Sequence, residues 1–346
     1  MVDPPPTADQ IRLFRESEPK MRERDIADKI GVSEAQLTAA YCGFSATRID
    51  AHPDTVMGAA QQFGEVMALT RNLSCVHEKI GRYENYHPGQ HAAMVLADNV
   101  DLRIFPKHWR HAYMVEKESD AGVRRSLQVF DAAGDAVHKI FLRPGSDQAA
   151  FARCRTELAT EDQSPELVVQ ARIAPEAPKS VPEKLEILRK EWQRMTDTHQ
   201  FLRLVSKLKM NRLGAYRIAG EPFARELAPD AVNRLLGALQ QACVEVMLFV
   251  GNKGCIQIHT GSLETLKPMG PWQNVLDPTF NLHLRLDHVA EVWAVGKPTQ
   301  RGLATSVEAF DRHGMLIFQV FGVPKEGRDS RAALRAIVDE LEGVAA

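Results

Sequence analysis

Helical spacing and strand-like alternation of apolar residues divide the chain into two similar series of elements. Apolar residues at helical spacing predict helices within 8–42, within 184–219 and at about 230–242. Short runs rich in β-branched and aromatic residues follow and predict strands at 102–105, 111–115, 126–130 and 137–142, then at 282–286, 290–295, 306–310 and 316–321. Asp-Ala-Ala-Gly at 131–134 and Asp-Arg-His-Gly at 311–314 predict hairpin turns. Each half is therefore expected to be an α+β fold, with helices first and an antiparallel sheet after them.

The two halves also repeat one another in sequence. Cys75, Leu102 and Phe130 each have an identical residue 180 positions later. The same offset relates the other matching pairs, which are Val76 and Ile256, Val95-Leu96 and Val275-Leu276, Asp131 and Asp311, Gly134 and Gly314, Phe141 and Phe321, and Pro144 and Pro324. Because a constant offset without a gap is hard to obtain by chance, it indicates a tandem duplication.

A polar, proline-rich segment separates the two repeats. Three prolines lie within residues 172–183, a composition typical of an extended linker. We therefore expect an N-terminal repeat at 1–173, a linker at 174–182 and a C-terminal repeat at 183–346. Two such halves would leave a cleft between them, which is a common place for a ligand.

Composition and charge mainly exclude classes of protein. The 346 residues carry a formal net charge of -2, which gives no electrostatic reason to expect a nucleic acid partner. The five cysteines are scattered without a C-x-x-C motif, which argues against a disulfide framework and suits a reducing compartment. We see no secretory signal and no apolar run near the roughly 18–20 residues that span a bilayer. The expected protein is cytoplasmic and not embedded in a membrane.

The segment around His199 carries the first candidate chemistry. Asp197 is a good N-cap residue, and Gln200 three positions later completes a pattern similar to a capping box. Phe201 and Val205 continue at helical spacing, so His199 is expected in the first turn of a helix, beside its buried face. A histidine held there can present a ring nitrogen to iron, since neutral imidazole is a standard heme ligand. The spacing alone also suits an ordinary histidine at the start of a helix.

A second candidate is the strand that contains Arg103. Alternation places Arg103 and Phe105 on one face, and Leu102 and Ile104 on the other. An arginine beside a phenylalanine could cover a flat aromatic ligand, although a surface arginine on a half-exposed strand fits equally well. The position 180 residues later is His283, so the two halves differ at this point.

Residues 25–40 resemble a helix-turn-helix, which raises the alternative of a transcription factor. The neutral charge, a pI of about 6.6 and the absence of a basic recognition face weaken that interpretation. A packed helical hairpin is the better prediction.

Several motifs of the chain resemble those of the HemS/ChuS/ShuS/PhuS family of cytoplasmic hemin-transport and hemin-degrading proteins. The motifs are Thr-Asp-Thr-His-Gln-Phe at 196–201, Leu-Arg-Ile-Phe at 102–105 followed by His108-Trp109, and Phe-Val-Gly-Asn at 249–252. The resemblance covers nearly the whole chain, including its length and its tandem halves. It implies two halves that each contain a β-sheet, with one heme b between them as ligand or substrate.

The resemblance also implies roles for individual residues. His199 would be the proximal iron ligand, and Arg103, from the other half, the distal residue. Phe105 and Phe249 would be apolar wall residues on the distal side, and Phe321 would also contact the heme. Arg212, Lys297 and Gln319 would contact the propionates or the rim. Some relatives have Tyr at the position of Phe321 and a second wall Phe at the position of Val246.

Two functions follow from this resemblance, and the sequence does not separate them. The protein could take heme from an inner-membrane importer and pass it to a heme oxygenase or another acceptor. It could instead open the porphyrin itself with dioxygen and an outside reductant. In that reaction Arg103 cannot be a general base, because guanidinium stays protonated, but it can donate a hydrogen bond to an oxygen ligand of the iron.

Overall fold

The computed structural model describes residues 5–118 and 122–343, which fold into two compact units. The first unit comprises the described parts of Met1–Arg71, Glu78–Ile173 and Gly251–Gln257. The second comprises those of Asn72–His77, Ala174–Val250 and Ile258–Ala346. Each unit therefore contains a short hairpin segment from the other half of the sequence.

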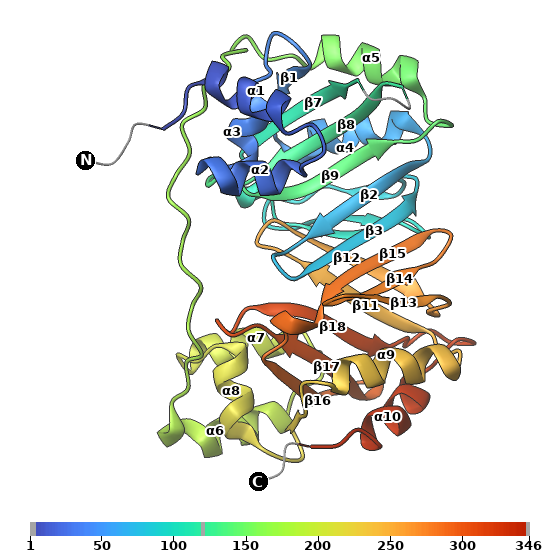
Figure 1. Cartoon of the computed structure of the whole chain (residues 1–346). Coiled ribbons are helices and arrows are strands. Elements are labelled where there is room, and N and C mark those ends of the chain that lie inside the picture. Colours follow the sequence, from blue (N-terminus) through green and yellow to red (C-terminus); the bar gives the residue numbers. More distant parts are fainter. Residues whose placement is uncertain (1–4, 119–121, 344–346) are drawn as a thin grey trace. The chain divides into compact units, whose positions relative to one another are not determined.

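The elements of the first half start with short helices and end with another helix (Figure 1). In chain order they are α1 (Ala8–Ser17), α2 (Glu23–Ile30), α3 (Glu34–Ala39), β1 (Ala46–Ile49), α4 (Pro53–Ala60), β2 (Val66–Arg71), β3 (Cys75–Gly81), β4 (Tyr86–His87), β5 (Ala93–Leu96), β6 (Asp101–Ile104), β7 (His111–Lys117), β8 (Arg124–Phe130), β9 (Ala136–Leu142) and α5 (Gln148–Glu157).

The second half repeats this order. Its elements are α6 (Leu185–Gln193), α7 (Gln200–Lys207), α8 (Arg212–Ala219), β10 (Ala224–Leu227), α9 (Ala231–Gln241), β11 (Val246–Gly251), β12 (Cys255–Gly261), β13 (Leu266–Met269), β14 (Trp272–Leu276), β15 (Phe280–Arg285), β16 (Glu291–Thr299), β17 (Gly302–Phe310), β18 (Leu316–Gly322) and α10 (Arg331–Asp339).

Strand order and register are the same in the two units. The antiparallel order is β1-β7-β8-β9-β2 in the first unit and β10-β16-β17-β18-β11 in the second. Val66 pairs with Leu142, and Val246 pairs with Gly322, so both partners of the pair shift by 180 positions. The β-bulge next to Phe130 recurs at the same offset. The α+β fold with duplicated halves, expected from the sequence, is confirmed.

In the second unit, the two faces of the sheet are packed differently. Alternate residues of β11, β17 and β18, such as Leu248 and Val320, join the apolar sides of α9 and α10 in one core. The opposite face packs against α6, α7 and α8 through a cluster that includes Trp192, Phe201 and Tyr216. These helices position the candidate site.

The helices predicted within 8–42, within 184–219 and near 230–242 are confirmed as α1 to α3, α6 to α8 and α9. The pair α2–α3, where a helix-turn-helix was considered, packs as a helical hairpin around Ile26 and Leu37. The helices α4, α5 and α10 were not predicted, and the repeat limits at 1–173 and 183–346 stay a prediction. In the part of the chain that the structure describes, no helix combines the length and apolar character needed to cross a bilayer.

Candidate functional site

His199 lies at the N-terminal end of α7, with 93% of its side chain exposed. The carboxylate oxygen Oδ1 of Asp197 accepts a hydrogen bond from the backbone N–H of His199 over 2.7 Å, and it lies 2.7 Å from Nδ1 of the same residue. Because a carboxylate only accepts, Nδ1 carries a ring proton, and in the neutral imidazole Nε2 then carries the lone pair. The lone pair of Nε2 is therefore available to a metal ion.

The predicted capping pattern was wrong in detail. The helix α7 begins at Gln200, with His199 as its N-cap residue, and Asp197 bonds to His199 instead of capping the helix. The side chain of Gln200 pairs with Thr196, whose backbone N–H donates to Oε1 over 2.9 Å. The two hydrogen bonds from His199 lower the pKa of Asp197, which keeps this carboxylate charged.

The loop before α7 is fixed to the rest of the second unit. The backbone N–H of Gln300 donates to the carbonyl oxygen of Thr196 over 3.0 Å. The indole N–H of Trp192, a fully buried side chain, donates to the carbonyl oxygen of Gly296 over 3.0 Å. His199 is thus exposed, but the backbone that carries it is anchored to β16 and to the turn after it.

Two aromatic side chains lie partly exposed on the sheet face that α6 to α8 cover in part. Cross-strand pairing places Trp293, Glu308, Gln319 and Phe249 in one row across this face. Phe321 lies in the next row, and its ring centroid is 5.4 Å from that of Phe249 at an interplanar angle of 72°. Three of the predicted contact residues, Phe249, Gln319 and Phe321, are therefore neighbours.

Arg212 and Lys297, which the resemblance assigns to the rim, belong to a buried ion cluster. Glu308 is fully buried, and its carboxylate lies 2.6 Å from Nζ of Lys297 and 2.7 Å from Nη1 of Arg212. The hydroxyl of Tyr216 donates to the same carboxylate over 3.0 Å. Lys297 is only 3% exposed, whereas the Arg212 side chain is 21% exposed. Arg212 is thus the more accessible of the two cations.

The charges of this cluster stabilise one another. Burial opposes ionisation of Glu308, but the adjacent cations of Lys297 and Arg212 hold its pKa well below the usual range. Burial lowers the pKa of Lys297, and the Glu308 carboxylate works against that shift. The ammonium of Lys297 also lies 5.1 Å from the ring centroid of Phe201 and 5.8 Å from that of Phe321. It therefore links α7 to the aromatic face of the sheet.

Arg103 and Phe105 belong to the first unit, where the predicted alternation is confirmed. Leu102 and Ile104 are fully buried, whereas Arg103 and Phe105 are partly exposed. The guanidinium of Arg103 bonds to the carboxylate of Asp101 and to the carbonyl oxygen of Leu102.

Comparison with known proteins adds to this geometry. A family model described as the haemin-degrading HemS.ChuX domain matches residues 31–158 and again residues 209–341. The chain belongs to this HemS/ChuX family. Hemin transport protein HemS of Yersinia enterocolitica is 37% identical, with 96% of each chain covered.

Two solved structures of the family are also similar to the chain. Holo-PhuS, described as a heme-binding protein from Pseudomonas aeruginosa, has a TM-score of 0.92 at 37% identity and covers 97% of this chain and 98% of its own. ChuS, described as an E. coli heme oxygenase, has a TM-score of 0.85 at 33% identity and covers 94% of this chain and 98% of its own.

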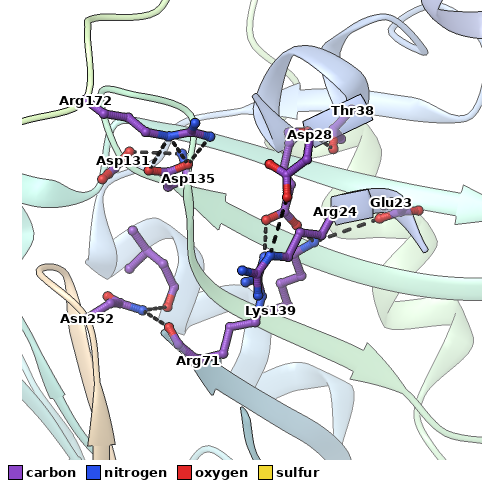
Figure 2. A network of polar contacts seen from close by, with 12 residues as sticks. Glu23, Arg24, Asp28, Thr38, Arg71, Asp131, Asp135, Lys139, Arg172 and Asn252 are labelled. Carbon is purple, nitrogen blue, oxygen red and sulfur yellow. Dashed lines mark hydrogen bonds and ion pairs between the residues drawn. The ribbon is translucent and has the colours of Figure 1, made fainter. Parts of the chain in front are cut away.

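The two HemS/ChuX repeats of the chain differ at the position of the aromatic face. In the first unit, Lys139 stands where Gln319 stands in the second, and Leu69 stands where Phe249 stands. Figure 2 shows Lys139 and Arg71 within a polar network of the first unit.

Glu34 lies between the cations of this network. Its carboxylate is 2.9 Å from Nζ of Lys139 and also pairs with the guanidinium of Arg71. Burial opposes its ionisation, but these cations lower the pKa of Glu34 to about 2. At this register position the first repeat therefore has Leu69 and an ion-paired Lys139 where the second has Phe249 and Gln319, whereas Phe141 keeps the aromatic residue found at Phe321.

Sequence reasoning missed the partners of the predicted site residues. Asp197 was interpreted as a helix cap, and Glu308 and Tyr216 were not singled out. An acidic residue at 308, between the apolar Val307 and Ala309 of a strand, was the available signal for a buried ion pair. Among the described residues, no group of three or more His, Cys, Asp or Glu side chains could hold a metal ion by itself.

Proposed function

We propose that this member of the HemS/ChuX family binds heme, with His199 as the ligand of the iron, and serves bacterial heme uptake and iron use. The observation that carries the proposal is the exposed imidazole of His199, whose Nδ1 is held by Asp197, so that the neutral ring presents Nε2 as the donor atom. Its relatives support the proposal, since PhuS is described as heme-binding and HemS as a hemin transport protein.

The residues of the second unit fit such a ligand. Heme has a broad apolar face, two carboxylates and an iron with axial positions for a ligand. Phe249 and Phe321 offer a partly exposed aromatic surface, and Lys297 connects this surface to the helix that His199 caps. Burial of the macrocycle against such residues would supply most of the binding energy, at about 25 cal/mol per Å² of apolar area.

Arg212 and Lys297 would serve heme binding differently. Arg212 is partly exposed at the start of α8, so its guanidinium could reach a propionate with the donors that Glu308 does not use. Lys297 is buried, so we propose that it supports α7 and the ring of Phe321 instead of contacting the rim. Gln319 is half-buried beside Phe249 and could donate through its amide. Arg103 and Phe105 stay predictions that rest on the resemblance.

We favour a cytoplasmic carrier that receives imported heme and passes it to a heme oxygenase or another acceptor. The alternative is an enzyme that opens the porphyrin with dioxygen and an external reductant, and the description of ChuS as a heme oxygenase supports it. Both activities need the same ligand and the same aromatic surface.

One experiment tests binding and separates the two roles. Purified protein is titrated with heme, then reduced in air with and without catalase, and the products are analysed. A carrier binds heme with an axial-histidine spectrum and gives bleaching that catalase abolishes. A tetrapyrrole product that forms in the presence of catalase would establish the enzyme, and absence of saturable binding would contradict both roles.

A further inference from the structure

We propose that Asp197 is a positioning residue that orients the imidazole of His199 and strengthens it as a donor to heme iron. This inference rests on the proposed function, because it assigns a role to Asp197 only if His199 binds the iron.

The geometry fixes both the ring and its tautomer. One oxygen of Asp197 accepts the backbone N–H of His199 and also lies 2.7 Å from Nδ1. The backbone hydrogen bond holds the carboxylate in place, so the bond to Nδ1 restrains the rotation of an otherwise exposed ring. Without this bond the proton could occupy either ring nitrogen, and a neutral ring with its proton on Nε2 could not donate to the iron through that atom.

The charge of Asp197 adds an electronic effect. A carboxylate that accepts the proton of Nδ1 increases the electron density of the ring, which makes Nε2 a stronger donor. A stronger donor stabilises ferric heme more than ferrous heme, and hydrogen bonding to an axial ligand is one means by which proteins set the potential of heme. Asp197 is therefore expected to lower the reduction potential of the bound heme.

The chain offers a matched control in the same loop. Gln200 also bonds to this loop, but its side-chain amide pairs with the backbone N–H and the hydroxyl of Thr196, whereas Asp197 bonds to the ring of His199. A change at Gln200 disturbs the same segment without removing the bond to Nδ1. Asn at position 197 keeps an oxygen acceptor of the same size but removes the negative charge.

The test compares Asp197→Asn, Asp197→Glu and Gln200→Ala with the unchanged protein, each loaded with heme. The measurements are heme affinity, the ferric/ferrous midpoint potential and the iron–histidine stretching frequency of the ferrous form. For Asp197→Asn we expect the preference for ferric over ferrous heme to fall about tenfold, which corresponds to a rise of about 59 mV for a one-electron couple. The stretching frequency should fall as well, Asp197→Glu should recover part of both changes, and Gln200→Ala should match the unchanged protein.

An unchanged potential and stretching frequency in Asp197→Asn would overturn the proposal, and so would equal shifts in Gln200→Ala. A parallel His199→Ala variant separates this failure from failure of the proposed function. If that variant retains the original heme spectrum, His199 is not the ligand and the role of Asp197 falls with it.

Discussion

Lys139 and Gln319 occupy the same position in the two repeats, but their cross-strand neighbours differ. Gln319 pairs with Phe249 across β18 and β11, whereas Lys139 pairs with Leu69 and bonds to Glu34. The duplicated framework has thus been kept while the side chains at one register position have diverged. The proposed ligand surface therefore lies at a register position where the two repeats have diverged.

Replacement of Phe249 tests that surface. Because its ring is partly exposed and packs against Phe321, Phe249→Ala should weaken heme binding by about tenfold to a hundredfold, the range of a well-placed aromatic contact. Leu69→Ala, at the matching position of the first unit, is the control and should leave the affinity unchanged. Affinity is measured by spectroscopic titration. A larger loss of heme affinity in Leu69→Ala than in Phe249→Ala would show that the ligand surface has been assigned to the wrong repeat.

The buried cluster around Glu308 should matter more for stability than any surface ion pair. Glu308→Gln leaves the cations of Lys297 and Arg212 without their common anion, which should lower the free energy of unfolding by about 3–5 kcal/mol. Lys297→Met should cost less, because Arg212 remains to balance Glu308. The double variant should be more stable than the sum of the two losses predicts. Urea unfolding of all three variants checks this, and additive losses would argue against a shared cluster.

Glu34 should make the first unit sensitive to acid. The pKa of Glu34 is lowered from 4.5 to about 2 in the folded protein, so its contribution is complete above pH 4.5 and is lost as the pH falls towards about 2. The size of this contribution is on the order of 3 kcal/mol, from about 1.4 kcal/mol for each unit of pKa.

The test for Glu34 is urea unfolding of Glu34→Gln at pH 7 and at pH 3. The variant should be clearly less stable than the unchanged protein at pH 7, and the difference should be smaller at pH 3. Glu157→Gln, an exposed position at the end of α5, is the control. A stability difference that is the same at both pH values would contradict the assignment.

Sequence patterns predicted the strands β6 to β9 and β15 to β18, because alternation and turn residues are local signals, but they did not predict β1 to β5 or β10 to β14. The hairpins after Phe130 and Phe310 follow directly from the Asp and Gly residues of their turns, where Gly134 and Gly314 have positive φ angles. The helix α5 was missed because it buries only Ala150, Phe151 and Cys154, which leaves a weak apolar pattern. Tertiary packing, not local periodicity, stabilises such a helix.

The candidate site was less predictable because its contacts join distant segments. The repeat and the family motifs were enough to single out His199, Phe249 and Phe321. They did not reveal that Lys297 is buried, because its partner Glu308 lies on the next strand and their contact depends on the register of that hairpin. Capping rules predicted that the carboxylate of Asp197 would accept from the first turn of the helix, whereas in the structure it bonds to His199. The sequence therefore carried no sign of the role proposed for Asp197.

Arg103 should control the reactivity of the iron more than heme affinity. A single hydrogen bond from a charged donor adds only about 1.5–3 kcal/mol, and only to states with an oxygen ligand. Arg103→Ala should therefore change heme affinity by less than tenfold but alter the oxidation rate of ferrous heme in air by a larger factor. His283→Ala, at the matching position of the other repeat, should change neither. Loss of heme affinity with a normal oxidation rate would mean that Arg103 is a rim or folding residue.

The most direct test of the account is a heme titration of His199→Ala beside the unchanged protein and His313→Ala, which removes an exposed histidine from the β17–β18 turn. Loss of the iron ligand should lower heme affinity by about a hundredfold, equivalent to about 2.7 kcal/mol, or replace the spectrum with that of a different axial ligand. His313→Ala should behave like the unchanged protein. An unaltered spectrum and affinity in His199→Ala would contradict the assignment of His199 as the heme ligand.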